Sequence, residues 1–297
     1  MNPGIHLVHK PVGMTSFQIV RRFVAEAREA GLGKLTVGHG GTLDPFAEGL
    51  LLMLVGQATR LMELLHPLPK TYVAEVAWGS ETDTCDHQGL EVAAGDPGNL
   101  DPELLDKALA PFLGWTNQIP PATSAKKIGG EAAYRKAHRG EEVVLPPSRV
   151  YLHQARWLRH DLPGSSLLEL TCRGGFYVRS LARDLGRTLG CGAHLGRLRR
   201  TAIGPWNDPG PGLQECLVGE ALLPWCPSRR VDDPELDRLL HGRPIPMERL
   251  QPPLWELPEG FPDPSAPVQA LHEGRLVALL KEKDGAWWTF ANLRGGL

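Results

Sequence analysis

The 297-residue chain has few cysteines and no long apolar segment, and each shortage excludes a class of protein. Its five cysteines are an odd number without a Cys-x-x-Cys pair, so neither a disulfide framework nor a zinc ribbon is expected. No run of about 18 uncharged apolar residues is present, which excludes a transmembrane helix. The first residues also lack the apolar stretch of a signal peptide. With 42% hydrophobic residues the chain can still build a full core, so we expect a globular, cytoplasmic protein.

The chain also lacks an excess of either charge, since its formal net charge is −2. This balance argues against a polyanionic partner only if the charges are evenly spread. Residues 171–205 hold seven basic residues and one acidic residue, whereas residues 61–110 hold two basic and ten acidic residues. Because screening limits the reach of a charge to about 8–10 Å, a local basic surface can bind phosphates in an acidic protein. The alternative for such a stretch is a solvated helix face.

Hydrophobic periodicity predicts both helices and strands. Helices are expected at residues 15–30, 103–113, 131–140 and 176–190. Strands are expected at residues 71–78, 167–172, 275–280 and 286–290, the last two as a hairpin. The Pro/Gly-rich residues 205–227 are interpreted as a connecting segment. In the last helix Arg179, Arg183 and Arg187 recur every four residues and share a face.

The loop at residues 38–45 is the strongest local signal for chemistry. Three glycines within four positions allow a close approach of the backbone to a partner, and Pro45 favours an extended conformation at Asp44. A carboxylate held in this way ahead of an apolar segment is a candidate catalytic group. The alternative from spacing alone is an Asp that caps a following helix.

Residues 38–51 (GHGGTLDPFAEGLL) resemble the catalytic motif of TruB-type tRNA pseudouridine synthases, in which the Asp before Pro is essential. Four further segments match the same family in the same order. They are KPVGMTS at 10–16, KTY at 70–72 with GSETDT at 79–84, QIPP at 118–121 with Ser124-Ala125, and RGGFYVRS at 173–180 leading to GCGAHL at 190–195. Five collinear motifs over residues 8–205 are specific enough to set the capping alternative aside.

The resemblance implies an α+β fold, in which a mixed, largely antiparallel sheet is flanked by helices. The catalytic domain would span residues 1–232, with a linker at about 205–232, and a PUA-like β-barrel domain that binds RNA would span 233–297. The implied activity is the isomerisation of uridine 55 in the T-arm loop of tRNA, through flipping of the base into a pocket. Because the reaction is an isomerisation, no metal or organic cofactor is implied. No protein partner and no membrane are implied either.

The resemblance also assigns roles to individual residues. Asp44 would be the ionised catalytic carboxylate, Arg179 would pair with it and lower its pKa, and Tyr72 would stack on the flipped base. Tyr177 and Leu198 match walls of the substrate pocket. From the residues alone, Arg179 could equally be a surface charge, and Tyr72, Tyr177 and Leu198 could be core residues.

The remaining predicted contacts are with RNA. His39 matches the family histidine that fills the space left by the flipped base, although an ordinary loop histidine is the simpler alternative. Cations near the site would bind the RNA backbone without reading its bases. The candidates are Lys10, Arg135, Lys136, Arg139, Arg183, Arg187, Arg197, Arg199 and Arg200.

The sequence departs from the family pattern at one position, because Thr123 stands where the family commonly has Tyr. The details of substrate binding at this point are therefore open. Two other functions remain as alternatives. One is a non-catalytic RNA-binding or RNA-folding protein on the same scaffold, which the complete set of Asp44, Tyr72 and Arg179 disfavours. The other is a guide-RNA-dependent pseudouridine synthase, which the absence of long basic or Gly/Arg-rich extensions disfavours.

Overall fold

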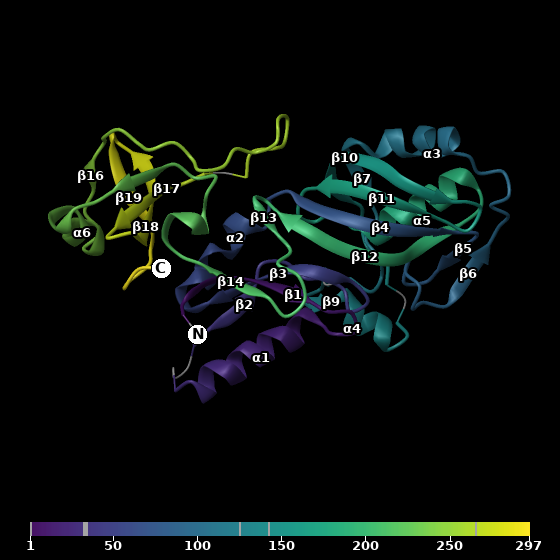
Figure 1. The fold of residues 1–297 in the computed structure, drawn as a ribbon, viewed down its shortest axis with the longest axis horizontal. Coiled ribbons are helices and arrows are strands. Elements are labelled where there is room, and N and C mark those ends of the chain that lie inside the picture. The colour runs from purple at the N-terminus through teal and green to yellow at the C-terminus, as the bar shows by residue number, and fades with distance from the viewer. Residues whose placement is uncertain (1, 32–34, 125, 142, 265) are drawn as a thin grey trace. The chain divides into compact units, whose positions relative to one another are not determined.

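A computed structural model of the chain describes residues 2–31, 35–124, 126–141, 143–264 and 266–297. The chain forms two compact units (Figure 1). Met1–Leu68 and Ala202–Leu297 form the first, called the terminal unit, and Pro69–Thr201 form the second, the central unit. Within the described residues, no helix combines the length and the apolarity that a membrane crossing requires.

A small antiparallel sheet organises the first part of the terminal unit. Its strands, in spatial order, are β14 (Gln214–Leu217), β1 (Gly4–Lys10), β3 (Glu48–Val55) and β2 (Val37–His39). Strand β3 is buried on both faces over its last seven residues, which explains its unbroken apolar sequence. One face of β3 packs on helix α1 (Ser16–Glu29). The helix begins with a capping box between Thr15 and Gln18 and confirms the helix predicted there.

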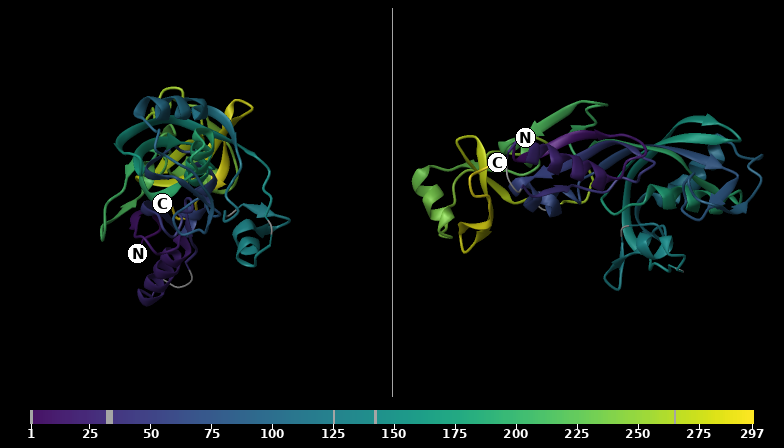
Figure 2. Two further views of the ribbon diagram at one scale, coloured as in Figure 1. Left: turned by 90° about the vertical axis from the view of Figure 1, so that its right-hand side faces the viewer. Right: turned by 90° about the horizontal axis from the view of Figure 1, so that it is seen from below.

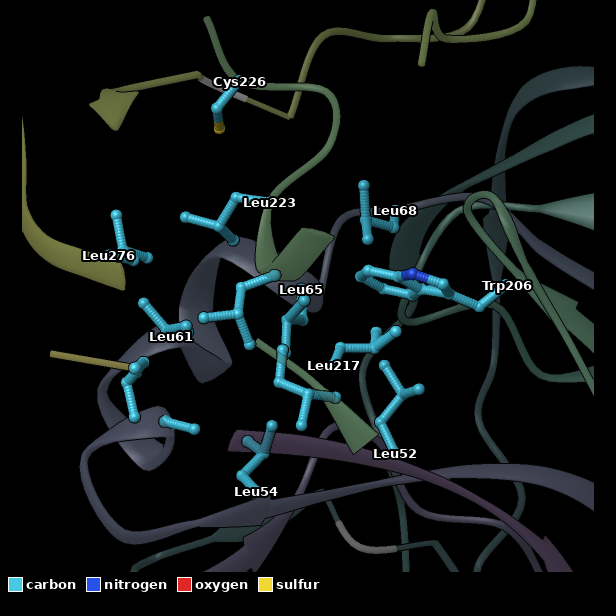
Figure 3. Packing of buried hydrophobic residues seen from close by; sticks show 14 of the residues in the cluster. Leu52, Leu54, Leu61, Leu65, Leu68, Trp206, Leu217, Leu223, Cys226 and Leu276 are labelled. Carbon is cyan, nitrogen blue, oxygen red and sulfur yellow. The ribbon is translucent and has the colours of Figure 1, made fainter. Parts of the chain in front are cut away.

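The other face of β3 belongs to a large apolar core (Figure 3). Leu52 and Leu54 of β3 point toward Leu61 and Leu65, which belong to the short helices η1 (Gly56–Leu61) and α2 (Met62–Leu65). The core also takes in buried residues beyond position 200, namely Ile203, Trp206, Leu217, Leu222, Leu223, Trp225, Cys226, Leu271, Leu276, Leu279, Leu293 and Leu297. The core of the terminal unit is therefore shared between residues near the N-terminus and residues near the C-terminus of the chain.

The C-terminal residues form a second, five-stranded sheet. Its spatial order is β15 (Ser228–Arg230), β17 (Val268–His272), β18 (Arg275–Lys283), β19 (Ala286–Asn292) and β16 (Ile245–Pro246), accompanied by helix α6 (Asp233–Leu240). Only β15 and β17 run parallel among the pairs described in this sheet. The β18–β19 hairpin and the small β domain were both predicted. The boundary at residue 233 stays a prediction, and the sheet itself already includes Ser228–Arg230.

The central unit is built on a set of neighbouring strands with helices against them. Its strands follow the order β12 (Ala193–Ile203), β4 (Lys70–Trp78), β11 (Ser165–Cys172), β10 (Ser148–Asp161) and β7 (Gly114–Gln118). Helix α5 (Val178–Leu189) contacts β4 and helix α3 (Pro102–Leu109), which ends in the turn η2 (Ala110–Phe112). Strand β4 alternates buried and half-buried residues, as expected for a strand between a core and a more open face.

Two short hairpins complete the central unit. Strands β5 (Ser80–Thr82) and β6 (Glu91–Ala94) form one of them. The other consists of β8 (Lys127–Ile128) and β9 (Glu131–Ala132), followed by helix α4 (Ala133–His138). This second hairpin and α4 stand away from the strands of their own unit in both views (Figure 2).

The fold is α+β with largely antiparallel pairing, as predicted, but two expected segments differ. The helix predicted at residues 131–140 is only six residues long, because Glu131–Ala132 pair as a strand. Residues 205–227 are more than a connection, since they contain β13 (Trp206–Asn207), β14 and the turn η3 (Gly219–Leu222). Strand β14 forms only because β1 offers it an edge, and such pairing with a distant partner leaves no local sequence pattern.

Candidate active site

Asp44 lies in the loop between β2 and β3, and the backbone around it is anchored in the terminal unit. The Ser16 hydroxyl donates to the Leu43 carbonyl at 3.1 Å and accepts from the Leu43 amide at 2.9 Å. The Gly13 amide donates to the Pro45 carbonyl at 2.8 Å. Leu43 is buried, whereas Asp44 is half-buried. The motif at residues 10–16, which contains Gly13 and Ser16, therefore holds the backbone on either side of Asp44.

The chain after Asp44 enters a strand, so the helix-capping alternative is wrong. The Ala47 amide donates to the Asp44 carbonyl at 3.1 Å in a turn, and β3 begins at Glu48. The loop also needs its glycine at position 40, because a Cβ there would lie 3.1 Å from the Leu52 Cβ. The loop sequence therefore suits one particular backbone conformation, and the Asp44 side chain does not cap a helix.

Lys10 is buried, contrary to its predicted role as a contact for RNA phosphates. None of its surface is exposed, and its ammonium donates to the carbonyls of Met14 at 2.7 Å and Pro11 at 2.9 Å. A longer contact of 3.4 Å reaches the Pro45 carbonyl next to Asp44. Lys10 therefore supports the loop from inside the protein, where a phosphate has no access.

Arg179, in the first turn of α5, is the centre of a buried polar cluster in the central unit. Its Nη1 donates to the Thr123 hydroxyl at 2.7 Å, the Thr84 carbonyl at 3.0 Å and the Asp86 carboxylate at 3.3 Å. Asp86 is itself buried and accepts from the Thr84 hydroxyl at 2.7 Å and the Gln88 amide at 3.1 Å. Only 5% of Arg179 is exposed, so the surface-charge alternative is wrong.

The loop after β7 packs against the start of α5 through side-chain bonds to backbone groups. Gln118 accepts from the Tyr177 amide at 2.8 Å and donates to the Tyr177 carbonyl at 3.0 Å. The Ile119 carbonyl accepts from Ser180 at 2.8 Å and from Arg183 at 3.0 Å. These bonds place the half-buried Tyr177 and the loop on the same end of the helix.

Tyr72 and Leu198 lie on neighbouring strands, β4 and β12, and both are buried. The structure brings them into one sheet, and their contact with a substrate stays a prediction. Lys70, two residues before Tyr72, is also buried. Burial, together with the nearby charge of Arg200, lowers the pKa of Lys70 to about 7. A lysine on the same strand face as Tyr72 thus exchanges its proton near neutral pH.

The predicted RNA-contacting cations divide into buried and exposed groups. Arg183 is 7% exposed and Arg200 is 1% exposed, so neither is available to a phosphate, contrary to prediction. Arg197 and Arg199 are exposed, because they alternate with the buried Leu198 and Arg200 along β12. Arg135 on α4 is exposed as well. These three arginines remain candidates for contact with RNA.

Two further predicted cations form close ion pairs. Arg187 donates to both carboxylate oxygens of Glu81, at 2.5 and 2.7 Å. Arg139 donates to both carboxylate oxygens of Glu131 and to one oxygen of Glu141. His39 ends β2 opposite Met53 and is half-buried, and its contact with RNA stays a prediction.

The structure thus groups Arg179, Tyr177, Tyr72 and Leu198 in the central unit, while Asp44, Lys10 and His39 belong to the terminal unit. Sequence reasoning missed Asp86 and Gln118, which bind Arg179 and the Tyr177 backbone. Gln118 belongs to the motif at 118–121, and Asp86 lies two residues after the motif at 79–84, so a search of the polar residues in and just beyond these motifs could have found them. Ala125, part of the fourth motif, lies outside the described residues.

Comparisons with known proteins agree on one family. Residues 29–178 match the family model of the TruB family pseudouridylate synthase N-terminal domain, and residues 179–248 match that of the tRNA pseudouridylate synthase B C-terminal domain. The tRNA pseudouridine synthase B of Thermobifida fusca is 36% identical over 93% of this chain and 96% of its own length. That of Parasynechococcus marenigrum is 42% identical over 78% of this chain and 81% of its own length.

Solved structures show the same fold at lower identity. A chain in a crystal structure of a Cbf5–Nop10–Gar1 complex superposes with a TM-score of 0.66 at 22% identity, covering 98% of this chain and 84% of that one. A chain in an H/ACA RNP bound to a substrate RNA has a TM-score of 0.65 at 20% identity, covering 97% of this chain and 84% of that one.

Proposed function

Because the chain belongs to the TruB family of pseudouridylate synthases, we propose that it converts uridine 55 in the T-arm loop of tRNA to pseudouridine. The observation that carries this proposal is Asp44 in its anchored loop, inside a motif that resembles the family's catalytic segment. The relatives named above are called tRNA pseudouridine synthase B and match most of the chain. The choice of position within tRNA rests on the resemblance.

We propose Asp44 as the catalytic carboxylate and Arg179 as the cation that pairs with it. In the reaction the bond from ribose C1′ to uracil N1 breaks and a bond from C1′ to C5 forms. C5 loses a proton and N1 gains one, so atoms and charge balance without a second substrate. The target base must first leave its stack, at a cost of a few kcal/mol. Tyr72 would stack on the extruded base, and Tyr177 and Leu198 would bound its pocket.

Three of the exposed arginines are proposed to contact the RNA backbone. Arg197 and Arg199 on β12, together with Arg135 on α4, would neutralise phosphates without reading bases. RNA of this kind is recognised through the shape of its loop and its 2′-hydroxyl groups. His39 would fill the space left by the flipped base.

The decisive experiment replaces the proposed catalytic carboxylate. Asp44→Asn should lower the rate of tritium release from tRNA labelled at uridine C5 by at least about 10³-fold, the scale of loss when a group acting on the reacting atoms is removed. The dissociation constant for tRNA should stay within about threefold of the wild-type value. Glu63→Gln, an equal charge change at an exposed position of α2, serves as the control and should release tritium normally. Turnover by Asp44→Asn at the wild-type rate would rule out the assignment.

We further propose that the chain acts alone and in the cytosol. The solved structures of similar fold come from multi-component complexes. Activity without added components would distinguish this chain from a guide-RNA-dependent enzyme. Purified protein should form pseudouridine in an unmodified tRNA transcript without any added RNA or protein. Binding of the transcript without conversion would instead favour the non-catalytic alternative.

A further inference from the structure

Thr123, which stands where the family commonly has Tyr, lies against the guanidinium of Arg179. We propose that Thr123 is a positioning residue, whose hydroxyl orients Arg179 for pseudouridine formation. The inference rests on the proposed function, because it assumes that Arg179 acts in the reaction. It adds a role for a position at which this chain differs from the Tyr that is common in the family.

The hydrogen bonds of Arg179 support this role. The Thr123 hydroxyl accepts from Nη1 at 2.7 Å, a shorter bond than those to the Thr84 carbonyl at 3.0 Å and the Asp86 carboxylate at 3.3 Å. The Thr123 carbonyl also faces the second terminal nitrogen, Nη2, at 3.5 Å. Thr123 therefore contacts both ends of the planar guanidinium fork, which restrains its rotation more than a single acceptor does.

The position of Thr123 does not depend on its own hydroxyl. The loop that carries it is bound to α5 by Gln118, through both backbone groups of Tyr177, and by the Ile119 carbonyl, through Ser180. Gln118 and Ser180 are almost fully buried, so these bonds are shielded from competition with water. Removing the Thr123 hydroxyl should therefore leave the loop in place and change only the restraint on Arg179.

The choice of a short side chain also fits this arrangement. Threonine is branched at Cβ, which limits its χ1 angle, and its hydroxyl is two bonds from the backbone. The hydroxyl therefore has a nearly fixed position once the loop is docked. A tyrosine hydroxyl lies much farther from the backbone and could not occupy the same point from this loop position.

The test compares two replacements that differ in the hydroxyl. Thr123→Val keeps the shape and removes the acceptor, whereas Thr123→Ser keeps the acceptor. Thr123→Val should lower the single-turnover rate on tRNA by about 10- to 100-fold, as expected for loss of a hydrogen bond to a charged group. Its dissociation constant for tRNA should not change, and Thr123→Ser should stay within about threefold of wild type in both measurements.

Thr188→Val provides a matched control on the same helix. Thr188 is exposed, and its hydroxyl donates to the Asp184 carbonyl of its own helix at 2.9 Å. This variant should turn over normally. If it lowers the rate as much as Thr123→Val does, the effect is not specific to Arg179 and the inference is wrong.

A double-variant cycle tests whether Thr123 acts through Arg179. Lysine cannot keep the two-ended contact, so Thr123→Val should lower the rate in the wild-type background but not in the Arg179→Lys background. Equal losses in both backgrounds would overturn the inference. Arginine-selective ¹⁵N NMR gives a readout independent of activity, since Thr123→Val should release the hindered rotation of one guanidinium and Thr123→Ser should not.

These outcomes separate the inference from the function on which it rests. If the wild-type chain forms no pseudouridine, the proposed function fails, and the NMR comparison alone decides whether Thr123 restrains Arg179. If the wild type is active and Thr123→Val is equally active, the function stands and the positioning role is wrong.

Discussion

Helix α5 and strand β12 both carry arginines from the most basic part of the sequence, yet they use them in opposite ways. Arg179 and Arg183 of α5 are buried and bonded to carbonyl, hydroxyl and carboxylate groups of their own unit. Arg197 and Arg199 of β12 are exposed, and the nearest carboxylate to Arg197 is Glu75 at 3.7 Å. The basic part of the sequence therefore separates into two groups of arginines, one buried in the protein and one exposed to solvent.

The difference follows from geometry and desolvation. On α5 a four-residue spacing directs successive arginines to one face, and the loop after β7 supplies that face with acceptors. On β12 alternate residues point to opposite faces, so the basic run is split between interior and solvent. A buried guanidinium needs a partner for its donors, whereas an exposed one is solvated and remains available to a phosphate.

The largest effect should come from removing a buried arginine of α5. Arg183→Met should lower the free energy of unfolding by about 3 kcal/mol, because the Ile119 carbonyl and Asp184 lose a buried donor. Arg156→Met on β10 is the comparison. Its side chain is 72% exposed and its ion pair with the partly exposed Glu169 should contribute less than about 1 kcal/mol. Urea denaturation of both variants measures the two values, and similar losses would contradict the division between interior and surface.

A smaller effect is expected from the buried lysine of β4. Lys70 has a pKa of about 7 in the folded protein, against an ordinary value of 10.5. Below pH 7 it is charged in both states and the full cost of burying the charge is present. Between pH 7 and 10.5 only the unfolded chain holds the proton, so stability rises with pH.

Lys70→Met should therefore be favoured over wild type more at pH 6 than at pH 9, by about 2 kcal/mol in the free energy of unfolding. Lys107→Met on α3 is the control, because solvent reaches this lysine in both states. Its difference from wild type should be the same at the two pH values. A difference for Lys70→Met that does not change with pH would show that its ammonium is solvated.

The smallest effect should come from the exposed arginines of β12. Replacing Arg197 and Arg199 together with Ala should weaken tRNA binding by about tenfold at low salt and reduce the salt slope by about 1 to 2, while the melting temperature stays unchanged. Arg156 and Arg159 of β10 are exposed too, and their ion pairs with Glu169 and Asp161, both at 2.7 Å, are closer than the 3.7 Å contact of Arg197 with Glu75. Their double Ala variant has the same formal charge change and should keep the wild-type slope. Equal slopes for the two double variants would mean that β12 does not contact the phosphates.

The elements that the sequence predicts well have strong local signals. The capping box of α1, the alternation along β4, the helical spacing of α5 and the turn between β18 and β19 all lie within one element. Elements without such a local pattern are not predicted. Strand β14 exists because it pairs with β1 across about 200 residues, and β12 was seen only as the end of a motif.

The candidate site shows the same limit. Asp44, Tyr72 and Arg179 could be named from motifs, because each stands in a distinctive local context. The partners of Arg179 could not, since Thr84, Asp86 and Thr123 lie 56 to 95 positions away in the chain. Spacing along a chain carries no information about such contacts.

By itself the sequence determined the family, the loop that carries Asp44 and the elements with regular periodicity, because these depend on residues that are neighbours in the chain. Only the tertiary structure decided which cations are internal. Lys10, Arg183 and Arg200 are buried and Arg197 and Arg199 are not, although all five were equal candidates for contact with RNA. The physical reason is that the fate of a charge depends on the acceptors and the water around it, and folding supplies the acceptors from distant segments.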